Sequence, residues 1–321
     1  MYTELLIPLD GSPLADAAIP HAAEIARRLM GGLHLVRVFT PMTTLGAPPE
    51  AAALIPDPAW NERMEADARL WLDRRAESVR ESTGLAVTHE LRIGGPVDEI
   101  VAVANERRCA AIVCSTHGLG GWALRWLGSV ADGVIRHAAC PVLAMSEDAV
   151  ARGADVNRVL LLHDGSDISE AMVPHTVWLA RAFGASIDLL RVVAPPWVGD
   201  AFTTMRDAGE DPFGIDAFAE ESKVEIEHIA ARLRSDGFTV TSEVVVNVSP
   251  ARAILEHVER TNPDVIALAT YGRGLSRLFL GSVADKVLRS GARPTLCFRP
   301  ARHLTGDAAE HEGELMASTP A

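Results

Sequence analysis

The sequence predicts an α/β protein of two tandem domains, each with a five-stranded, mostly parallel sheet and helices on both faces. The chain repeats itself, since Asp10-Gly11-Ser12 recurs as Asp164-Gly165-Ser166. Each half alternates short apolar runs with helix-length amphipathic segments, and 321 residues are enough for about two domains. Strands that alternate with helices form right-handed βαβ units around a parallel sheet.

The repeat holds one register over most of each half. Between residues 5–38 and 159–192, 12 of 34 aligned positions are identical. The same offset matches Pro96 to Pro250, and after the glycine-rich loops it shortens by one residue, matching Gly128 to Gly281. We therefore expect homologous domains at 1–147 and 156–300. The polar, partly acidic residues 301–321 predict a disordered tail.

The elements of the first half follow from hydrophobic periodicity. Apolar runs predict strands, and apolar residues three and four apart predict helices. A proline-rich loop, 41–58, interrupts the series, and a glycine-rich loop precedes the last helix. The expected strands are 5–9, 33–39, 86–93, 110–116 and 141–146, and the expected helices are 12–30, 61–82, 96–108 and 129–138.

The second half repeats this order. Its expected strands are 159–163, 186–193, 239–246, 265–270 and 295–299. Its helices are expected to end near Phe183, to span about 216–236, and to begin at Pro250 and Ser282. The final strands of the two halves are candidate edges for pairing between modules or between two chains.

Composition narrows the class of protein. The net charge of −13, with acidic residues spread along the chain, argues against a nucleic-acid partner, which needs clustered basic residues. The four cysteines, Cys109, Cys114, Cys140 and Cys297, form no CxxC and no metal-ligand cluster, which is typical of buried thiols in a reducing compartment. With no membrane-spanning stretch or signal peptide in the sequence, we expect a cytoplasmic protein.

Candidate binding residues fall where parallel strands end. In such sheets, ligands bind beyond the carboxyl ends of the strands, where the strand order reverses. Asp10 ends the first strand, and the glycine loop after the fourth strand leads into a helix at Ser129. Glycine permits close backbone approach, and the first N–H groups of a helix attract phosphate. The same residues also fit a turn followed by a simple helix cap.

These features resemble the universal stress protein family. STHGLGGWALRWLGSVADGVIRHAACPVLAM and ATYGRGLSRLFLGSVADKVLRSGARPTLCF resemble its signature, and so do the opening strand–DGS–helix and Gly95-Pro96. The resemblance covers nearly all of residues 3–298 as two tandem modules. It implies Rossmann-like domains of the adenine nucleotide alpha hydrolase type, facing each other about a pseudo-two-fold axis.

The resemblance also implies an ATP site, which can include Mg²⁺, in at least one module. ATP-binding members carry G-x2-G-x9-G-[ST]; the first module has this spacing with Ser115 as the first residue, whereas the second begins with Ala269 and is one residue shorter. The first site is therefore the safer prediction. The residues carried over are Asp10, Gly11, Val38, Ser115, Gly118, Gly128, Ser129 and Val130 in module 1, and Asp164, Gly165, Val192, Thr270, Gly272, Gly281, Ser282 and Val283 in module 2.

Three functions remain open at this point. The resemblance implies a stress-response regulator that binds ATP and is not a dedicated catalyst. A scaffold that works through its module interface without nucleotide is the second candidate, and a weak ATPase is the third. An adenylating enzyme would need an SGGxDS-type loop after the first strand, where this chain has DGSPLAD and DGSDISE. No catalytic residue and no metal ligand is predicted.

Overall fold

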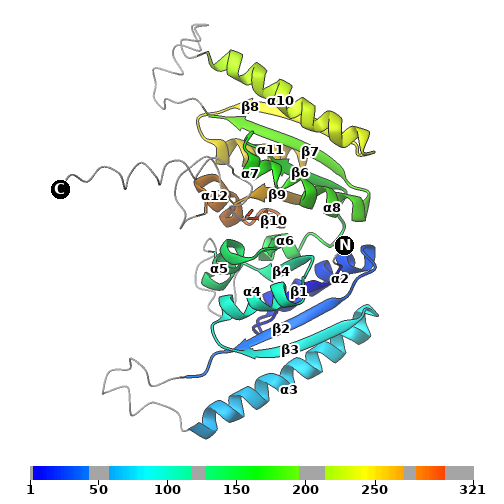
Figure 1. Ribbon diagram of the computed structural model, residues 1–321, viewed down its shortest axis with the longest axis vertical. Coiled ribbons are helices and arrows are strands. Elements are labelled where there is room, and N and C mark those ends of the chain that lie inside the picture. Colours follow the sequence, from blue (N-terminus) through cyan, green and yellow to red (C-terminus); the bar gives the residue numbers. More distant parts are fainter. Residues whose placement is uncertain (1–2, 43–57, 117–126, 195–213, 271–279, 301–321) are drawn as a thin grey trace, which may run out of the picture.

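The computed structural model describes residues 3–42, 58–116, 127–194, 214–270 and 280–300. They form one ten-stranded sheet with the strand order β3-β2-β1-β4-β5-β10-β9-β6-β7-β8 (Figure 1). The strands are β1 Leu5–Pro8, β2 Leu33–Phe39, β3 Val87–Ile93, β4 Ala111–Ser115, β5 Val142–Met145, β6 Arg158–Leu162, β7 Ser186–Val193, β8 Val240–Val246, β9 Val265–Ala269 and β10 Thr295–Phe298. Each predicted strand is thereby confirmed.

The two modules are joined through their last strands. β5 and β10 pair antiparallel, with Leu143 opposite Leu296, while the other pairings in the sheet are parallel. Of the two possibilities left open by the sequence, pairing between modules is therefore the one realised. The two five-stranded sheets become one sheet, and α3 and α10 lie at its far ends (Figure 1).

Helices cover both faces of the sheet. One face carries α1 Pro13–Ala17, α2 Ile19–Arg28, α3 Pro58–Thr83, α7 Asp167–Glu170, α8 Val173–Phe183 and α10 Ile215–Ser235. The other carries α4 Pro96–Glu106, α5 Ser129–His137, α11 Pro250–Thr261 and α12 Ser282–Ser290. Strand side chains alternate between the two cores: Leu5 and Ile7 pack in the first, and Leu6 packs in the second. Such strands, buried on both faces, read as continuous apolar runs.

The predicted helix over 12–30 is divided in the structure. α1 ends at Ala17 and α2 begins at Ile19, with Pro20 in its first turn. Proline has no N–H to donate to the preceding turn, so the helix restarts there. The segment 147–155, expected as a plain linker, contains the short helix α6, Glu147–Val150. The loop 41–58 lies mostly outside the described residues, as does the predicted tail 301–321.

Candidate functional site

The candidate site of each module lies where the strand order reverses. Along module 1 the chain passes from β1 outward to β2 and β3, and then returns to place β4 on the other side of β1. The loops that follow β1 and β4 therefore leave the same edge of the sheet from neighbouring strands. Module 2 repeats this arrangement with β6 and β9.

The Asp-Gly-Ser turns after β1 and β6 have the same geometry. The Oδ1 atom of Asp10 accepts a hydrogen bond from the Ser12 N–H at 2.8 Å, and the Oδ1 atom of Asp164 accepts one from the Ser166 N–H at 3.0 Å. The intervening Gly11 has φ +86°, in the left-handed region that favours glycine. The serine then caps the following helix. Each predicted aspartate thus shapes its turn through one carboxylate oxygen.

The segments after β4 and β9 anchor the starts of two helices. In module 1 the Thr116 N–H donates to the Met145 carbonyl at 2.8 Å, and the Gly128 N–H donates to the Thr116 carbonyl at 2.7 Å. In module 2 the Gly281 N–H donates to the Thr270 carbonyl at 2.9 Å. The first turn of α5, and that of α12, is therefore fixed to the end of the neighbouring strand. Ser115 ends β4, beside this anchor.

The first turns of α5 and α12 differ from those of α1 and α7. Neither Gly128 nor Gly281, the residue before each helix, provides a side-chain cap. Ser129 and Ser282 are exposed, and Val130 is 38% exposed. On the inner side, Val283 packs against the core. The first N–H groups of a helix need a partner from outside the helix, and the helix dipole makes that position favourable for an anion.

The valines at the ends of β2 and β7 face the second core. Val38 and Val192 are partly buried against it, on the side that carries α4, α5, α11 and α12. Because side chains alternate along a strand, the residue that precedes each valine points to the opposite face of the sheet. The valines lie next to β1 and β6 at the same edge of the sheet as the Asp-Gly-Ser turns.

Those preceding residues are arginines, which the sequence prediction missed. The guanidinium of Arg37 lies over the Trp71 ring at 4.4 Å, beside Gly11. The guanidinium of Arg191 lies beside Gly165. The sequence does carry a signal for these arginines, because an identical arginine lies inside an apolar strand in both halves of the repeat. Burying a charge is costly unless it is paired, so the repetition indicates a specific role.

The two arginines differ in how their charge is balanced. Arg191 is 4% exposed and forms an ion pair with Glu225 of α10. In the repeat register, Trp71 of α3 occupies the place of Glu225, so α3 supplies Arg37 with an aromatic ring instead of a carboxylate. Burial lowers the pKa of Arg37 and the nearby Asp10 opposes that change. An arginine keeps its charge under these conditions. In module 1 the carboxylate near the arginine is therefore that of Asp10, in the turn after β1, whereas in module 2 α10 supplies Glu225.

Two predicted residues cannot be placed. Gly118 and Gly272 lie outside the described residues, so the spacing of the two glycine loops stays a prediction. Among the described residues, no group of three His, Cys, Asp or Glu side chains could hold a metal ion. No helix in the described ranges is long and apolar enough to cross a membrane.

Comparison with known proteins decides the family. The model of the universal stress protein family matches residues 1–146 and 156–299. The chain belongs to the universal stress protein family. It is the tandem type, because both matches lie on one chain.

Tandem relatives match along nearly their full length. Universal stress proteins Rv2005c and Rv2623 of Mycobacterium tuberculosis are each 28% identical, and each alignment covers 92% of this chain and 96% of the relative. The crystal structure of a universal stress protein from Archaeoglobus fulgidus has a TM-score of 0.66 at 19% identity, covering 94% of this chain and 98% of that one. The predicted α/β fold of two tandem modules is confirmed.

Proposed function

We propose that this tandem universal stress protein is a cytoplasmic stress-response regulator that binds ATP, with module 1 as its stronger site. The observation that carries the proposal is the start of α5. Gly128 is held to the end of β4 by its hydrogen bond to Thr116, and no side chain caps the helix. A phosphate is a suitable partner for the N–H groups of such a turn.

The residues present suit the negative charge of a nucleotide's phosphates. The Ser129 hydroxyl would donate a hydrogen bond to a phosphate oxygen, and the backbone N–H groups in the first turn of α5 would bind the same phosphate. The cation of Arg37 adds attraction for an anionic ligand at this edge of the sheet. Asp10 and Val38 would lie on the adenosine side, as the family resemblance implies. Binding of ATP would give the module two states, with and without ligand, and Mg²⁺ would accompany the phosphates.

Module 2 has the same helix start but a weaker electrostatic case. Ser282 follows an uncapped Gly281, yet Arg191 is already paired with Glu225. A phosphate at this site would therefore gain less from the arginine than one in module 1. The shorter second glycine loop points in the same direction. We accordingly propose that ATP fills module 1 first.

Two alternatives compete with regulation by bound ATP. The continuous sheet across β5 and β10 suits a scaffold that needs no nucleotide. Slow hydrolysis of bound ATP is the other alternative. Extracting ligand from freshly purified protein by denaturation tests the first, because the proposal predicts adenine nucleotide at about one per chain and a scaffold predicts none. Labelled ATP with Mg²⁺ tests the second: the proposal predicts no turnover above that of a binding-deficient Ser129→Asp variant.

A further inference from the structure

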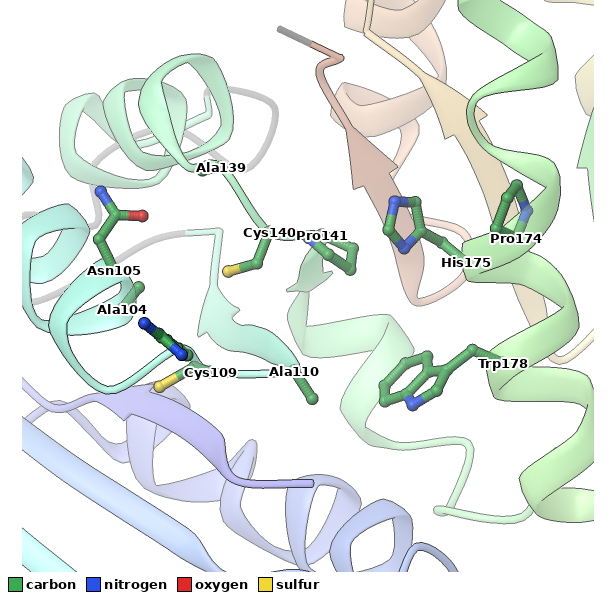
Figure 2. A pocket seen from close by; sticks show the side chains of 11 residues that line it. Ala104, Asn105, Cys109, Ala110, Ala139, Cys140, Pro141, Pro174, His175 and Trp178 are labelled. Atoms are coloured by element: carbon green, nitrogen blue, oxygen red, sulfur yellow. The ribbon is translucent and has the colours of Figure 1, made fainter. Parts of the chain in front are cut away.

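A cavity of about 450 Å³ lies between the two modules, away from the candidate nucleotide sites. Figure 2 shows His175 and Trp178 of α8 on one side, facing Cys109 and Cys140 of module 1 on the other. Ala139 and Arg108 also line it. The cavity therefore combines the end of α4 and the turn before β5 with a helix of the other module.

The lining of this cavity is mostly neutral and apolar. Burial lowers the pKa of His175 to about 4, so its ring is uncharged near neutral pH. Burial raises the pKa of the Cys140 thiol to about 11, so that group is also uncharged. Of the residues around the cavity, Arg108 brings a charge at the rim, where it is exposed. Such a site suits an apolar side chain with an acidic group nearby.

The repeat gives this cavity a counterpart in the other half of the molecule. Applying the repeat register, His175 corresponds to His21, Arg108 to Asn262 and Ala110 to Asp264. The counterpart is covered by residues 146–157, the segment that joins the modules. This segment contacts each of the three counterpart residues.

The joining segment, residues 146–157, makes polar contacts along its length. The Ser146 hydroxyl donates to the Gly291 carbonyl at 2.5 Å, and Arg152 donates to the Asn262 side chain at 2.6 Å. The Gly153 backbone lies next to His21. The Asn157 N–H then donates to Asp264 at 2.7 Å. The surface that this segment covers is polar, and the segment contacts it through polar groups.

In the repeat register, residues 146–157 correspond to residues 299–310, at the start of the C-terminal tail. It follows β10 as residues 146–157 follow β5, and in the repeat register Phe298 corresponds to Met145. The chain leaves β10 next to the cavity, because the Phe298 ring lies 4.1 Å from the His175 ring. Residues 299–310 match the joining segment in length, and the chain continues to Ala321. The tail starts in the right place and is long enough to cross the cavity.

We propose that the C-terminal tail of the same chain docks across this cavity, with Leu304 as its apolar contact. Leu304 is the large aliphatic residue of the tail nearest to β10, and it suits the apolar wall formed by Trp178 and Cys140. Asp307 and Glu310 follow it and can pair with the exposed Arg108. The docked tail covers this side of the junction through an apolar contact, as residues 146–157 cover the other side through polar contacts.

Thiol accessibility in the full-length protein tests this docking. A tethered segment has an effective concentration on the order of 1 mM, so an intrinsic Kd of about 0.1 mM would keep the cavity covered about nine-tenths of the time. We expect Leu304→Asp to increase the rate of N-ethylmaleimide labelling at Cys140 by about tenfold, measured by peptide mass spectrometry. Leu315→Asp is the matched control, because it lies beyond the length needed, and it should label like the wild type.

The outcomes distinguish the possible occupants. Equal Cys140 rates in the wild type and both variants would overturn the proposal. Wild-type protection that increases with protein concentration would assign the cavity to a second copy of the chain, and would also overturn it. The fully buried Cys297 serves as an internal standard, because labelling there reports unfolding. Protection lost in Leu304→Asp with Cys297 unlabelled, at every protein concentration, supports docking of the tail.

Discussion

The glycines of the two Asp-Gly-Ser turns should differ in their tolerance of alanine. Both have left-handed backbones, with φ +86° at Gly11 and +85° at Gly165. Alanine in this region costs roughly 1–2 kcal/mol, partly offset by about 0.4–1 kcal/mol from the stiffer unfolded chain. We expect Gly11→Ala to lower the free energy of unfolding by about 1 kcal/mol, because the nearest atom to the new Cβ, Arg37 Nη2, is 3.8 Å away.

Gly165→Ala should cost more, because the new Cβ would lie 2.8 Å from Arg191 Nη2 and 2.9 Å from its Cζ. Arg191 cannot move away freely, since it is buried, paired with Glu225 and close to the Phe218 ring. Overpacking of this kind adds roughly 1–3 kcal/mol, for a total of about 2–4 kcal/mol.

Urea unfolding at unchanged m-value measures both losses. Wild type and Arg191→Ala serve as backgrounds in a double-mutant cycle, where the extra cost of Gly165→Ala should largely disappear. Equal losses for Gly11→Ala and Gly165→Ala in the wild-type background would refute the predicted clash with Arg191.

Three further outcomes follow from buried and bridging groups. Burial lowers the pKa of His175 from 6.5 to about 4, so the stability that its neutral ring contributes is present above pH 6.5 and is lost as the pH falls toward 4, by up to about 3 kcal/mol. His175→Gln should therefore reduce the pH dependence of the urea unfolding midpoint between pH 6.5 and 4. An unchanged pH dependence in this variant would contradict the prediction. Ser146→Ala removes the hydrogen bond to Gly291 and the cap of α6, and should cost about 1–2 kcal/mol by the same assay, whereas no loss would show that α6 is held by packing alone. Burial raises the pKa of Cys114 to about 12, so Ellman's reagent at pH 8 should reach it only after urea unfolding; rapid reaction in the native state would be inconsistent with its position.

Local periodicity was enough to predict the strands and most helices. Apolar runs such as Val265–Ala269 are strongly constrained, because a strand buried on both faces admits few polar residues. The repeat then required a second module of the same kind. The division at Ala18 was missed because the amphipathic pattern continues through it, although Pro20 carried the signal. The start of α5 was predicted correctly from Gly128 and Ser129.

Features that depend on contacts between distant segments were harder to predict. The sequence identified β5 and β10 as pairing edges but could not choose between a partner module and a partner chain. The pairing of Arg191 with Glu225 joins residues from two elements, and only the fold places them together. The cavity beside His175 likewise needs the relative position of two modules, which no local pattern contains.

Binding of ATP to variants at the two helix starts tests the central claim most directly. Ser129→Asp and Ser282→Asp each place a carboxylate in the first turn of a helix, where it favours the helix and repels phosphate. Isothermal titration of the full-length protein with ATP should show the high-affinity site lost or weakened at least tenfold in Ser129→Asp, and retained in Ser282→Asp. Undiminished high-affinity binding in Ser129→Asp, with both variants folded, would contradict the assignment of ATP to module 1.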